Sequence, residues 1–345
     1  MNDSCTPAKM SAAWTSSIAN RWPLWLAPVI AAFYPYLLDV FHLSVTSAGG
    51  IDLAAALLLL AVFIVPLLGL LFACGARGHT LADTRARRLG LLLVVAPTLY
   101  CFVGVNLYML GSPVADGWVW TTAWLALAAL ATLVPGSATA ALAPRRSGSA
   151  LRVAHGLSGV IVTIFVVFHL FNHLFGLLGS DVHAAIMDWG RTFYRATLIE
   201  PLLVAALLFQ VVTGLRLAWQ WSATPSDHLR LFQLASGVFL AVFILGHLNA
   251  VFVFARLWGG IETDWAFATG APAGLIMDPW NIRLLPHYSL GVFFVLAHLG
   301  SGLRVVMLAH GASNKAANVA WSAVAGVAAL LSLAIILGMT GLRLA

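Results

Sequence analysis

Stretches of about 20 mostly apolar residues recur along almost the whole chain, and they limit the possible folds more than any other feature. A helix of that length crosses a hydrocarbon layer about 30 Å thick while satisfying its own backbone polar groups. Of the 345 residues, 61% are hydrophobic and 9% are charged, whereas an average soluble domain has about 25% charged residues. The sequence therefore predicts an all-α polytopic membrane protein and excludes a water-soluble globule.

We expect nine transmembrane helices in two regions. Residues 1–143 would form an N-terminal region of four spans, and residues 144–345 a region of five. Two connecting segments, 179–196 and 258–284, are long. The second mixes acidic residues with tryptophans, which suits either a folded cap at the membrane surface or an ordinary amphipathic loop. The predicted spans cover residues 24–43, 52–74, 89–110, 118–142, 153–178, 197–220, 231–257, 285–308 and 317–341.

Lysines and arginines gather in the segments that would lie on one side of the membrane. The N-terminal tail and the connections that follow spans two, four, six and eight hold 13 of the 18. Because cytoplasmic loops are enriched in these residues, we predict a protein of the inner (cytoplasmic) membrane, with its N-terminus in the cytoplasm and its C-terminus outside. The net charge of +6 then reflects the basic residues of the cytoplasmic connections, and we expect no nucleic-acid partner. The other five residues are Arg191, Arg195, Arg256, Arg283 and Arg343.

The C-terminal region contains an internal repeat. An offset of 78 residues aligns an arginine, a Ser-Gly pair and a His-Leu pair of span five with the same residues of span seven. The ends of spans six and eight share the pattern of a hydroxyl residue followed by Gly-Leu-Arg. We therefore interpret spans five–six and seven–eight as two copies of one helical hairpin. The corresponding residues are Arg152 and Arg230, Ser158 and Ser236, His169 and His247, and Arg216 and Arg304.

Two histidines of the repeat lie at equivalent depth inside apolar spans. His169 and His247 are each about 16 residues into a span that runs outward. An ionisable residue at membrane depth is costly and marks a functional site by default. Two imidazoles at one level on facing helices are what haem b requires of a protein. Ser158 and Ser236 are small, so they leave room for a flat macrocycle or for close helix contact. We predict a haem between His169 and His247; a hydrogen bond between buried helices is the alternative.

A second level lies nearer the predicted cytoplasmic side. Gln210 and His298 are each about 14 residues below the external ends of spans six and eight. Glutamine is not a usual haem ligand, so this level has one good ligand, and His155 could supply the other. Otherwise His155 and His298 would form hydrogen bonds to a quinone headgroup or a haem propionate.

The remaining candidates lie near the ends of the spans. Arg216 and Arg304 suit ion pairs with haem propionates or lipid phosphates, or else serve as topology markers whose charge reaches the membrane surface. His173, one turn after His169, would make a surface contact or support His169 from beside it, and the two could in principle bind a metal ion together. The histidines near loops, His183 and His287 among them, receive no role.

Residues 150–345 resemble the single-subunit diheme cytochrome b of succinate:quinone and quinol:fumarate oxidoreductases. His169, Gln210, His247 and His298 stand at four positions that are all histidine in that family. The resemblance implies that His169 and His247 hold the haem farther from the cytoplasm, and that Gln210 and His298 occupy the level of the nearer haem. It also implies a quinone and a partner subunit that carries iron–sulfur clusters. Gln210 departs from the family pattern, and the first four spans are foreign to it.

The sequence thus predicts a b-type cytochrome that transfers electrons between a membrane quinone and a redox partner, surrounded by lipid. The three cysteines, Cys5, Cys74 and Cys101, are far apart and form neither an iron–sulfur motif nor a CxxCH haem attachment. The chain would then be an electron-transfer subunit of an oxidoreductase rather than a self-sufficient enzyme. A tandem-repeat transporter and a membrane anchor without haem are the alternative functions.

Overall fold

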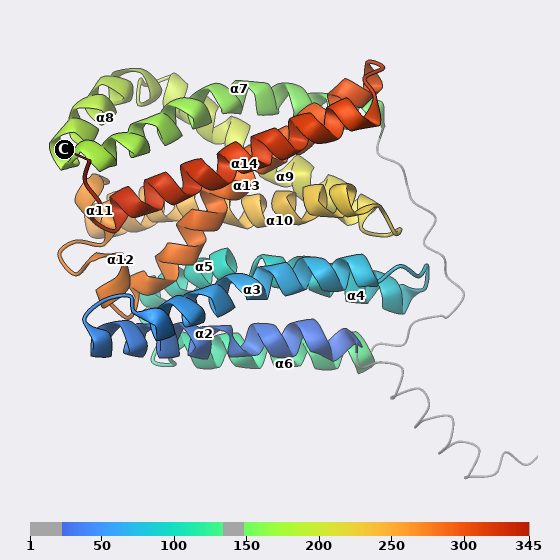
Figure 1. Cartoon of the computed structure of the whole chain (residues 1–345), viewed down its shortest axis with the longest axis horizontal. Helices are drawn as coiled ribbons and strands as arrows, with labels where there is room; N and C mark the ends of the chain where they lie inside the picture. The colour runs from blue at the N-terminus through green and yellow to red at the C-terminus, as the bar shows by residue number, and fades with distance from the viewer. Residues whose placement is uncertain (1–22, 134–147, 345) are drawn as a thin grey trace, which may run out of the picture.

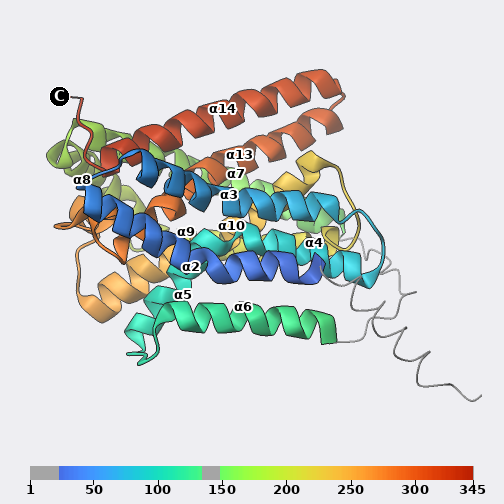
Figure 2. The ribbon, with the colours of Figure 1, turned by 60° about the horizontal axis from the view of Figure 1, so that its bottom comes forward.

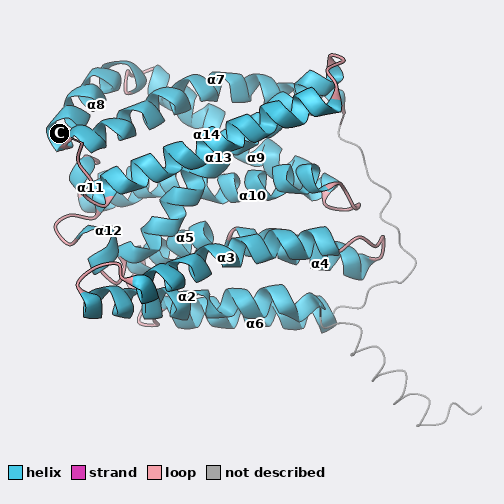
Figure 3. Cartoon of the chain, viewed as in Figure 1, coloured by secondary structure: helices cyan, strands magenta, loops and turns pink. Residues whose placement is uncertain are grey.

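The computed structural model describes residues 23–133 and 148–344, and every regular element within them is a helix (Figure 3). The first region contains α2 (Pro23–Ala48), α3 (Leu53–Gly75), α4 (Leu81–Val94), α5 (Ala96–Met109) and α6 (Asp116–Leu133). The second contains α7 (Ser149–Leu174), η1 (Phe175–Leu178), α8 (Ser180–Tyr194), α9 (Ile199–Trp221), α10 (His228–Leu248), η2 (Asn249–Gly259), α11 (Trp265–Thr269), α12 (Gly274–Met277), η3 (Asn281–Arg283), α13 (Leu284–Ala309) and α14 (Asn314–Met339).

The helices confirm an all-α polytopic membrane protein. Among the described residues, seven helices are long and apolar enough to cross a membrane, and the bent pair α4 and α5 would make an eighth crossing. Each of these eight crossings overlaps one of the nine predicted spans. The ninth predicted span, 118–142, has no matching crossing among the described residues: α6 covers its first part, and residues 134–142 lie outside the described residues. The number nine therefore stays a prediction.

The third crossing differs from the straight span predicted over 89–110. It begins at Leu81 and is broken at Val95, where the axes of α4 and α5 turn by 67°. Pro97 lies in the first turn of α5. Its nitrogen cannot donate a hydrogen bond, and its ring excludes a continuous helix through residue 93. Neighbouring helices surround the break, because Val94, Val95 and Ala96 are all buried.

The helices lie side by side in two groups, with the N-terminal helices α2 to α6 (blue to teal-green) together and the C-terminal helices from α7 onward (yellow-green to red) together (Figures 1 and 2). In the C-terminal group, α7 packs on α9, α9 on α10, α10 on α13, α13 on α14 and α14 on α7, so five helices close a ring. The N-terminal group packs against this ring through α10, which contacts α3, α4 and α5. Thus α10 belongs to the ring of five C-terminal helices and also lies at the boundary between the two regions.

The two long connections fold together as a cap at one end of the bundle. The guanidinium of Arg191 on α8 donates to the carbonyl of Thr263 at 2.9 Å, and Arg195 donates to the Thr263 hydroxyl at 2.9 Å. The indole of Trp265 is 7% exposed, and its ring lies 4.5 Å from the ring of His183 on α8. Of the two interpretations of segment 258–284, the folded cap is therefore the one observed.

A buried ion pair joins the two regions near this cap. The sequence places Arg283 among the few cations of the external side, but its side chain is 7% exposed and donates to Asp116 Oδ2 at 2.5 Å. The Tyr100 hydroxyl donates to the other oxygen of Asp116 at 3.0 Å, and the guanidinium lies 4.4 Å from the Tyr100 ring centroid. Arg283 therefore neutralises an acidic residue of the first region rather than marking a membrane surface.

A second junction lies at the opposite, arginine-rich end. Arg87 on α4 is 0% exposed, and its guanidinium donates to the carbonyls of Ala76, Gly78 and Ser222 at 2.7–3.1 Å. The first two carbonyls belong to the α3–α4 connection and the third to the end of α9. One side chain thus satisfies three carbonyls from both regions of the chain.

Replacing Asp116 by Asn should destabilise the protein by about 2–3 kcal/mol, because it leaves the buried Arg283 guanidinium without a counter-charge. Unfolding of the purified protein in a detergent–SDS titration measures this loss. The matched control is Asp188→Asn, which removes one exposed carboxylate partner of Arg191 while Glu262 remains as the other, and which should cost less than about 1 kcal/mol. Equal losses in the two variants would contradict the assignment of Arg283 and Asp116 as a junction.

Candidate functional site

The structure brings His169 of α7 and His247 of α10 together in the C-terminal bundle. Their ring centroids are 5.8 Å apart, and the ring planes are inclined by 74°. Within the described residues, neither imidazole forms a hydrogen bond to a protein group. The two rings thus lie close together, and no described residue occupies their nitrogens with a hydrogen bond.

Two imidazoles at this separation would suit a metal ion held between them, since a metal–nitrogen bond would be about 2 Å long. The helices that carry the rings belong to opposite parts of the bundle: α7 packs on α8, α9 and α14, and α10 packs on α9 and α13. The rings therefore meet across the middle of the bundle, between helices that are not neighbours in the ring.

Each imidazole is supported by a phenylalanine one helical turn earlier. The Phe165 ring lies 5.3 Å from His169 and is inclined by 22°, and the Phe243 ring lies 5.9 Å from His247 and is inclined by 9°. The offset of 78 residues also relates these two phenylalanines. The sequence analysis overlooked them, although the repeat would have identified them, because only the motif residues were aligned.

Further histidines continue from His169 toward the cap. The ring of His173 lies 4.7 Å from His169 and 5.4 Å from His183, and His183 contacts Trp265. The buried Nδ1 atoms of His173 and His183 have no hydrogen-bond partner among the described residues. Sequence analysis assigned no role to His183, because nothing in the sequence indicates that α8 folds back onto α7. In the part of the chain that the structure describes, no three His, Cys, Asp or Glu side chains form a metal-binding group.

His183 is held neutral by its surroundings. It is 2% exposed, and its Nε2 lies 3.2 Å from the amide nitrogen of Asn172, which makes Nε2 the acceptor of that bond. Burial, and to a smaller extent the charge of Arg191, lower the pKa of His183 to about 4 against the opposing effect of Asp264. At neutral pH the His183 ring is therefore uncharged where it lies against His173, the neighbour of His169.

At the inner level, His155 and His298 each place one ring nitrogen beside a hydroxyl of the neighbouring helix. His155 Nδ1 lies 2.8 Å from the Thr213 hydroxyl, which donates its own proton to the carbonyl of Phe209 at 2.6 Å. His298 Nδ1 lies 3.0 Å from the Ser236 hydroxyl, which donates to the carbonyl of Gln233. Each hydroxyl therefore accepts a hydrogen bond from Nδ1–H, and this network assigns the lone pair of each imidazole to Nε2.

Gln210 does not act as a partner of His298. Its amide donates to the backbone carbonyl of His155 at 2.8 Å, which ties α9 to α7. His155 and His298 are close enough to interact electrostatically. The repeat also predicts Ser158 as the counterpart of Ser236, but only Ser236 has a hydrogen bond to a histidine within the described residues. The inner level is thus the place where the two hairpins differ.

Glycines allow both inner imidazoles to lie against the neighbouring helix. A Cβ atom at Gly214 would lie 3.3 Å from Cε1 of His155, and one at Gly237 would lie 3.0 Å from Cε1 of His298. In the first hairpin the histidine is on the first helix and the glycine on the second, and in the second hairpin this order is reversed.

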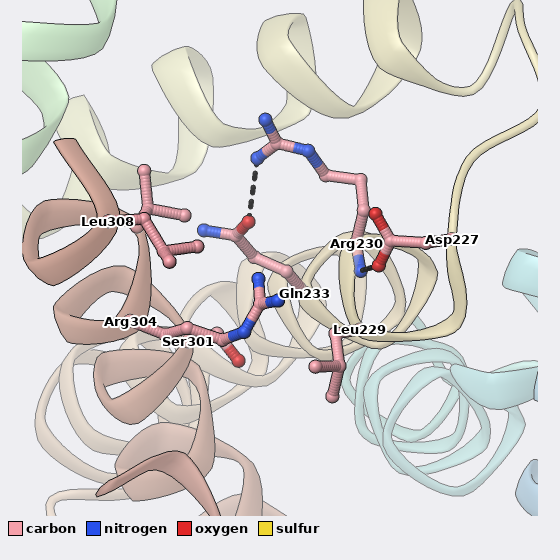
Figure 4. A pocket seen from close by; sticks show the side chains of 8 residues that line it. Asp227, Leu229, Arg230, Gln233, Ser301, Arg304 and Leu308 are labelled. Atoms are coloured by element: carbon pink, nitrogen blue, oxygen red, sulfur yellow. Dashed lines mark hydrogen bonds between the residues drawn. The ribbon is translucent and has the colours of Figure 1, made fainter. Parts of the chain in front are cut away.

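The two predicted arginines have different surroundings. Arg216 is exposed near the end of α9. Arg304 of α13 is half-buried, donates to Asn318 at 2.8 Å and lines a cavity of about 210 Å³ with Arg230 (Figure 4). The structure therefore separates two residues that the repeat treats as equivalent.

A larger cavity of about 630 Å³ opens beside His247. Its walls come from both regions of the chain and include Phe102 of α5, Phe254 of η2 and Tyr288 of α13. His287, which also lines it, is 5% exposed and has a buried Nδ1 without a partner among the described residues. The π-helical turns of η2, which begin two residues after His247, shape one wall; such turns are frequent at functional sites. Sequence analysis assigned no role to His287 because it lies at the predicted edge of a span.

The stability of the protein should fall as the pH is lowered from about 6.5 to about 4, partly through His183. In this range the unfolded imidazole takes up a proton and the folded one does not, so protonation favours unfolding by up to about 3 kcal/mol. His183→Gln should flatten the decline of the thermal midpoint with pH, whereas exposed His79→Gln should leave it unchanged. A decline of the same steepness in His183→Gln and the unmodified protein would refute this.

Comparison with known proteins identifies no relative: no protein-family model, no curated protein and no solved structure matches the chain.

Proposed function

We propose that the chain is an integral membrane b-type cytochrome that transfers electrons between a membrane quinone and a redox partner subunit. It would act as the cytochrome b subunit of succinate:quinone oxidoreductases does, which its C-terminal region resembles. The observation that carries the proposal is the convergence of His169 and His247 at a centroid distance of 5.8 Å. Haem b held there would supply one-electron redox chemistry.

The residues around this pair prepare it for ligation. Phe165 and Phe243 stack on the two imidazoles and restrict their rotation. His173 and neutral His183 line the same end of the bundle without introducing charge at neutral pH. A metal-ligating histidine must be neutral, and the low polarity of its surroundings adjusts the redox potential of the iron.

The inner level supports a second haem between His155 and His298. Both imidazoles present an Nε2 lone pair, and in both the other nitrogen is fixed by a hydroxyl of the neighbouring helix. Such a bond to the second nitrogen is the usual way in which proteins orient a ligating histidine. On this proposal, His155 takes the role that Gln210 would have in the related family.

The cavity beside His247 is suited to a quinone headgroup. Its volume of about 630 Å³ lies within the range of small-molecule sites, and its walls are largely aromatic. The buried imidazole of His287 can donate to or accept from one quinone oxygen. Reduction of a quinone to a quinol consumes two electrons and two protons, and the acidic side chains of Glu262 and Asp264 also line the cavity.

The proposed partners and orientation follow from the same function. The chain has no flavin or nucleotide motif and no iron–sulfur cysteine motif, so a partner subunit must exchange electrons with a soluble substrate. We infer the inner membrane as location and the arginine-rich end of the bundle as its cytoplasmic end. The described chain begins at that end with α2 and finishes at the other after α14 (Figure 1).

Purified protein should give a b-type reduced-minus-oxidised absorption band that is lost in His169→Ala and in His247→Ala. Removing either imidazole leaves the proposed iron with one axial ligand. The control is His228→Ala, an exposed histidine at the start of α10, which should keep the whole band. Variants are compared only if they elute as a single species.

The ratio of haem to protein then separates one site from two. A ratio near two that falls to one in His155→Ala supports the inner pair. A flat spectrum from protein produced with haem in the medium would reject the cytochrome and favour a tandem-repeat transporter or a haemless anchor.

His287→Ala should slow the reduction of the cytochrome by a short-chain quinol about tenfold or more while leaving the absorption band intact. The reason is that His287 lines the cavity but is not a proposed axial ligand. Stopped-flow absorbance with a short-chain ubiquinol or menaquinol analogue measures the rate. His310→Ala, an exposed histidine at the other end of α13, should react at the normal rate. Unchanged kinetics in His287→Ala would rule out this cavity as the quinone site.

A further inference from the structure

A second cavity, at the arginine-rich end of the bundle, does not belong to the proposed electron path. It has a volume of about 210 Å³ and lies between the first turns of α10 and the last turns of α13. Figure 4 shows Arg230 reaching into it from α10 and Arg304 from α13, with Gln233 between them in this view. The Arg230 guanidinium donates to Gln233 Oε1 at 2.7 Å, and Arg304 Nε donates to Asn318 Oδ1 at 2.8 Å.

The positive charge at this cavity exceeds the negative charge. Arg152 of α7 and Arg304 both repel Arg230 electrostatically, and Asp227 is the acidic residue that attracts it. The Asp227 carboxylate already accepts the backbone N–H of Arg230 at 2.9 Å, as the cap of α10. No salt bridge of Arg152, Arg230 or Arg304 occurs among the described residues. Arg230 and Arg304 line the cavity together with Asp227, and Arg152 adds a third positive charge nearby. These cations repel one another unless a further anion enters the cavity.

The arginines are also held in place, which distinguishes them from mobile charges at a membrane surface. The Arg230 guanidinium lies 4.3 Å from the centroid of the Trp221 ring, in addition to its bond to Gln233. Arg304 is fixed by Asn318 through Nε, so its two terminal nitrogens are free to form a fork. Val305 and Leu308 add an apolar wall, and Val305 is 40% exposed on the outer surface of α13.

We propose that this cavity binds the phosphate group of an anionic membrane lipid, with Arg230 and Arg304 as its ligands and Arg152 as a supporting charge. Arginine binds phosphate oxygens through paired donors. Basic cavities between transmembrane helices are typical sites for anionic lipid headgroups. The exposed apolar wall beside the cavity would contact an acyl chain. The same phosphate chemistry is offered by free inorganic phosphate, which the experiment distinguishes.

The test is native mass spectrometry of detergent-purified protein titrated with dioleoylphosphatidylglycerol, dioleoylphosphatidylcholine or inorganic phosphate. We expect one phosphatidylglycerol to bind more tightly than phosphatidylcholine. The double variant Arg230→Gln/Arg304→Gln should weaken phosphatidylglycerol binding about tenfold or more. The matched control is Arg216→Gln, because Arg216 is the repeat counterpart of Arg304 but does not line the cavity. This variant should bind phosphatidylglycerol as tightly as the unmodified protein. Arg230→Lys/Arg304→Lys, which retains the charge, should recover part of the affinity.

Two further results bear on the ligand. Displacement of the lipid by inorganic phosphate would support a phosphate site that also accepts the free anion. The proposal fails if the double variant binds phosphatidylglycerol as tightly as the unmodified protein, or if Arg216→Gln loses as much. It also fails if the double variant loses haem and retains the lipid, since the arginines would then serve haem propionates.

Discussion

The constraint on which the whole structure depends is that no polar group can be left to lipid. An apolar medium offers neither hydrogen bonds nor a high dielectric constant, so each buried charge must find its partner within the protein. Arg283 meets Asp116, and Arg87 meets three backbone carbonyls, at opposite ends of the boundary between the two regions. The same constraint places the histidines in the interior of the bundle. The contacts of Arg283 and Arg87 between the two regions and the burial of the histidines thus have the same physical cause.

The repeat shows how a symmetrical plan has diverged. At the outer level both hairpins keep a phenylalanine and a histidine one turn apart, and the two imidazoles face each other. At the inner level each hairpin has one histidine bound to a hydroxyl of its partner helix, but the histidine comes from the first helix in one copy and from the second in the other. Gln210 occupies the position that the symmetry would give to a histidine, and it connects helices instead. The outer level has therefore kept the symmetry of the repeat. At the inner level both hairpins have a histidine–hydroxyl hydrogen bond, but the residues that form it are at different positions of the repeat.

Sequence reasoning could predict what depends on local pattern. Hydropathy gave the class of fold and the approximate ends of most spans, and the offset of 78 residues identified His169 and His247 as a pair. It could not predict contacts that depend on how distant segments fold over one another. His183 reaches the site only because α8 returns along α7, and His287 reaches the cavity only because α13 begins beside α5 and α10. Arg283 was interpreted as a surface charge, since its partner Asp116 lies 167 residues away. The bend at Val95 did have a local signal in Pro97, which the hydropathy pattern concealed.

The contacts of Arg87 have a consequence for biosynthesis. Its partners at Ala76 and Gly78 precede it in the chain, but the carbonyl of Ser222 is synthesised 135 residues later. At about 5–20 residues per second, this delay is roughly 7–27 s. During that time the guanidinium already has two carbonyls of its own hairpin, so α3 and α4 can enter the bilayer without an unsatisfied cation. The third bond becomes possible only when α9 has been inserted, so this contact between the two regions forms late in synthesis.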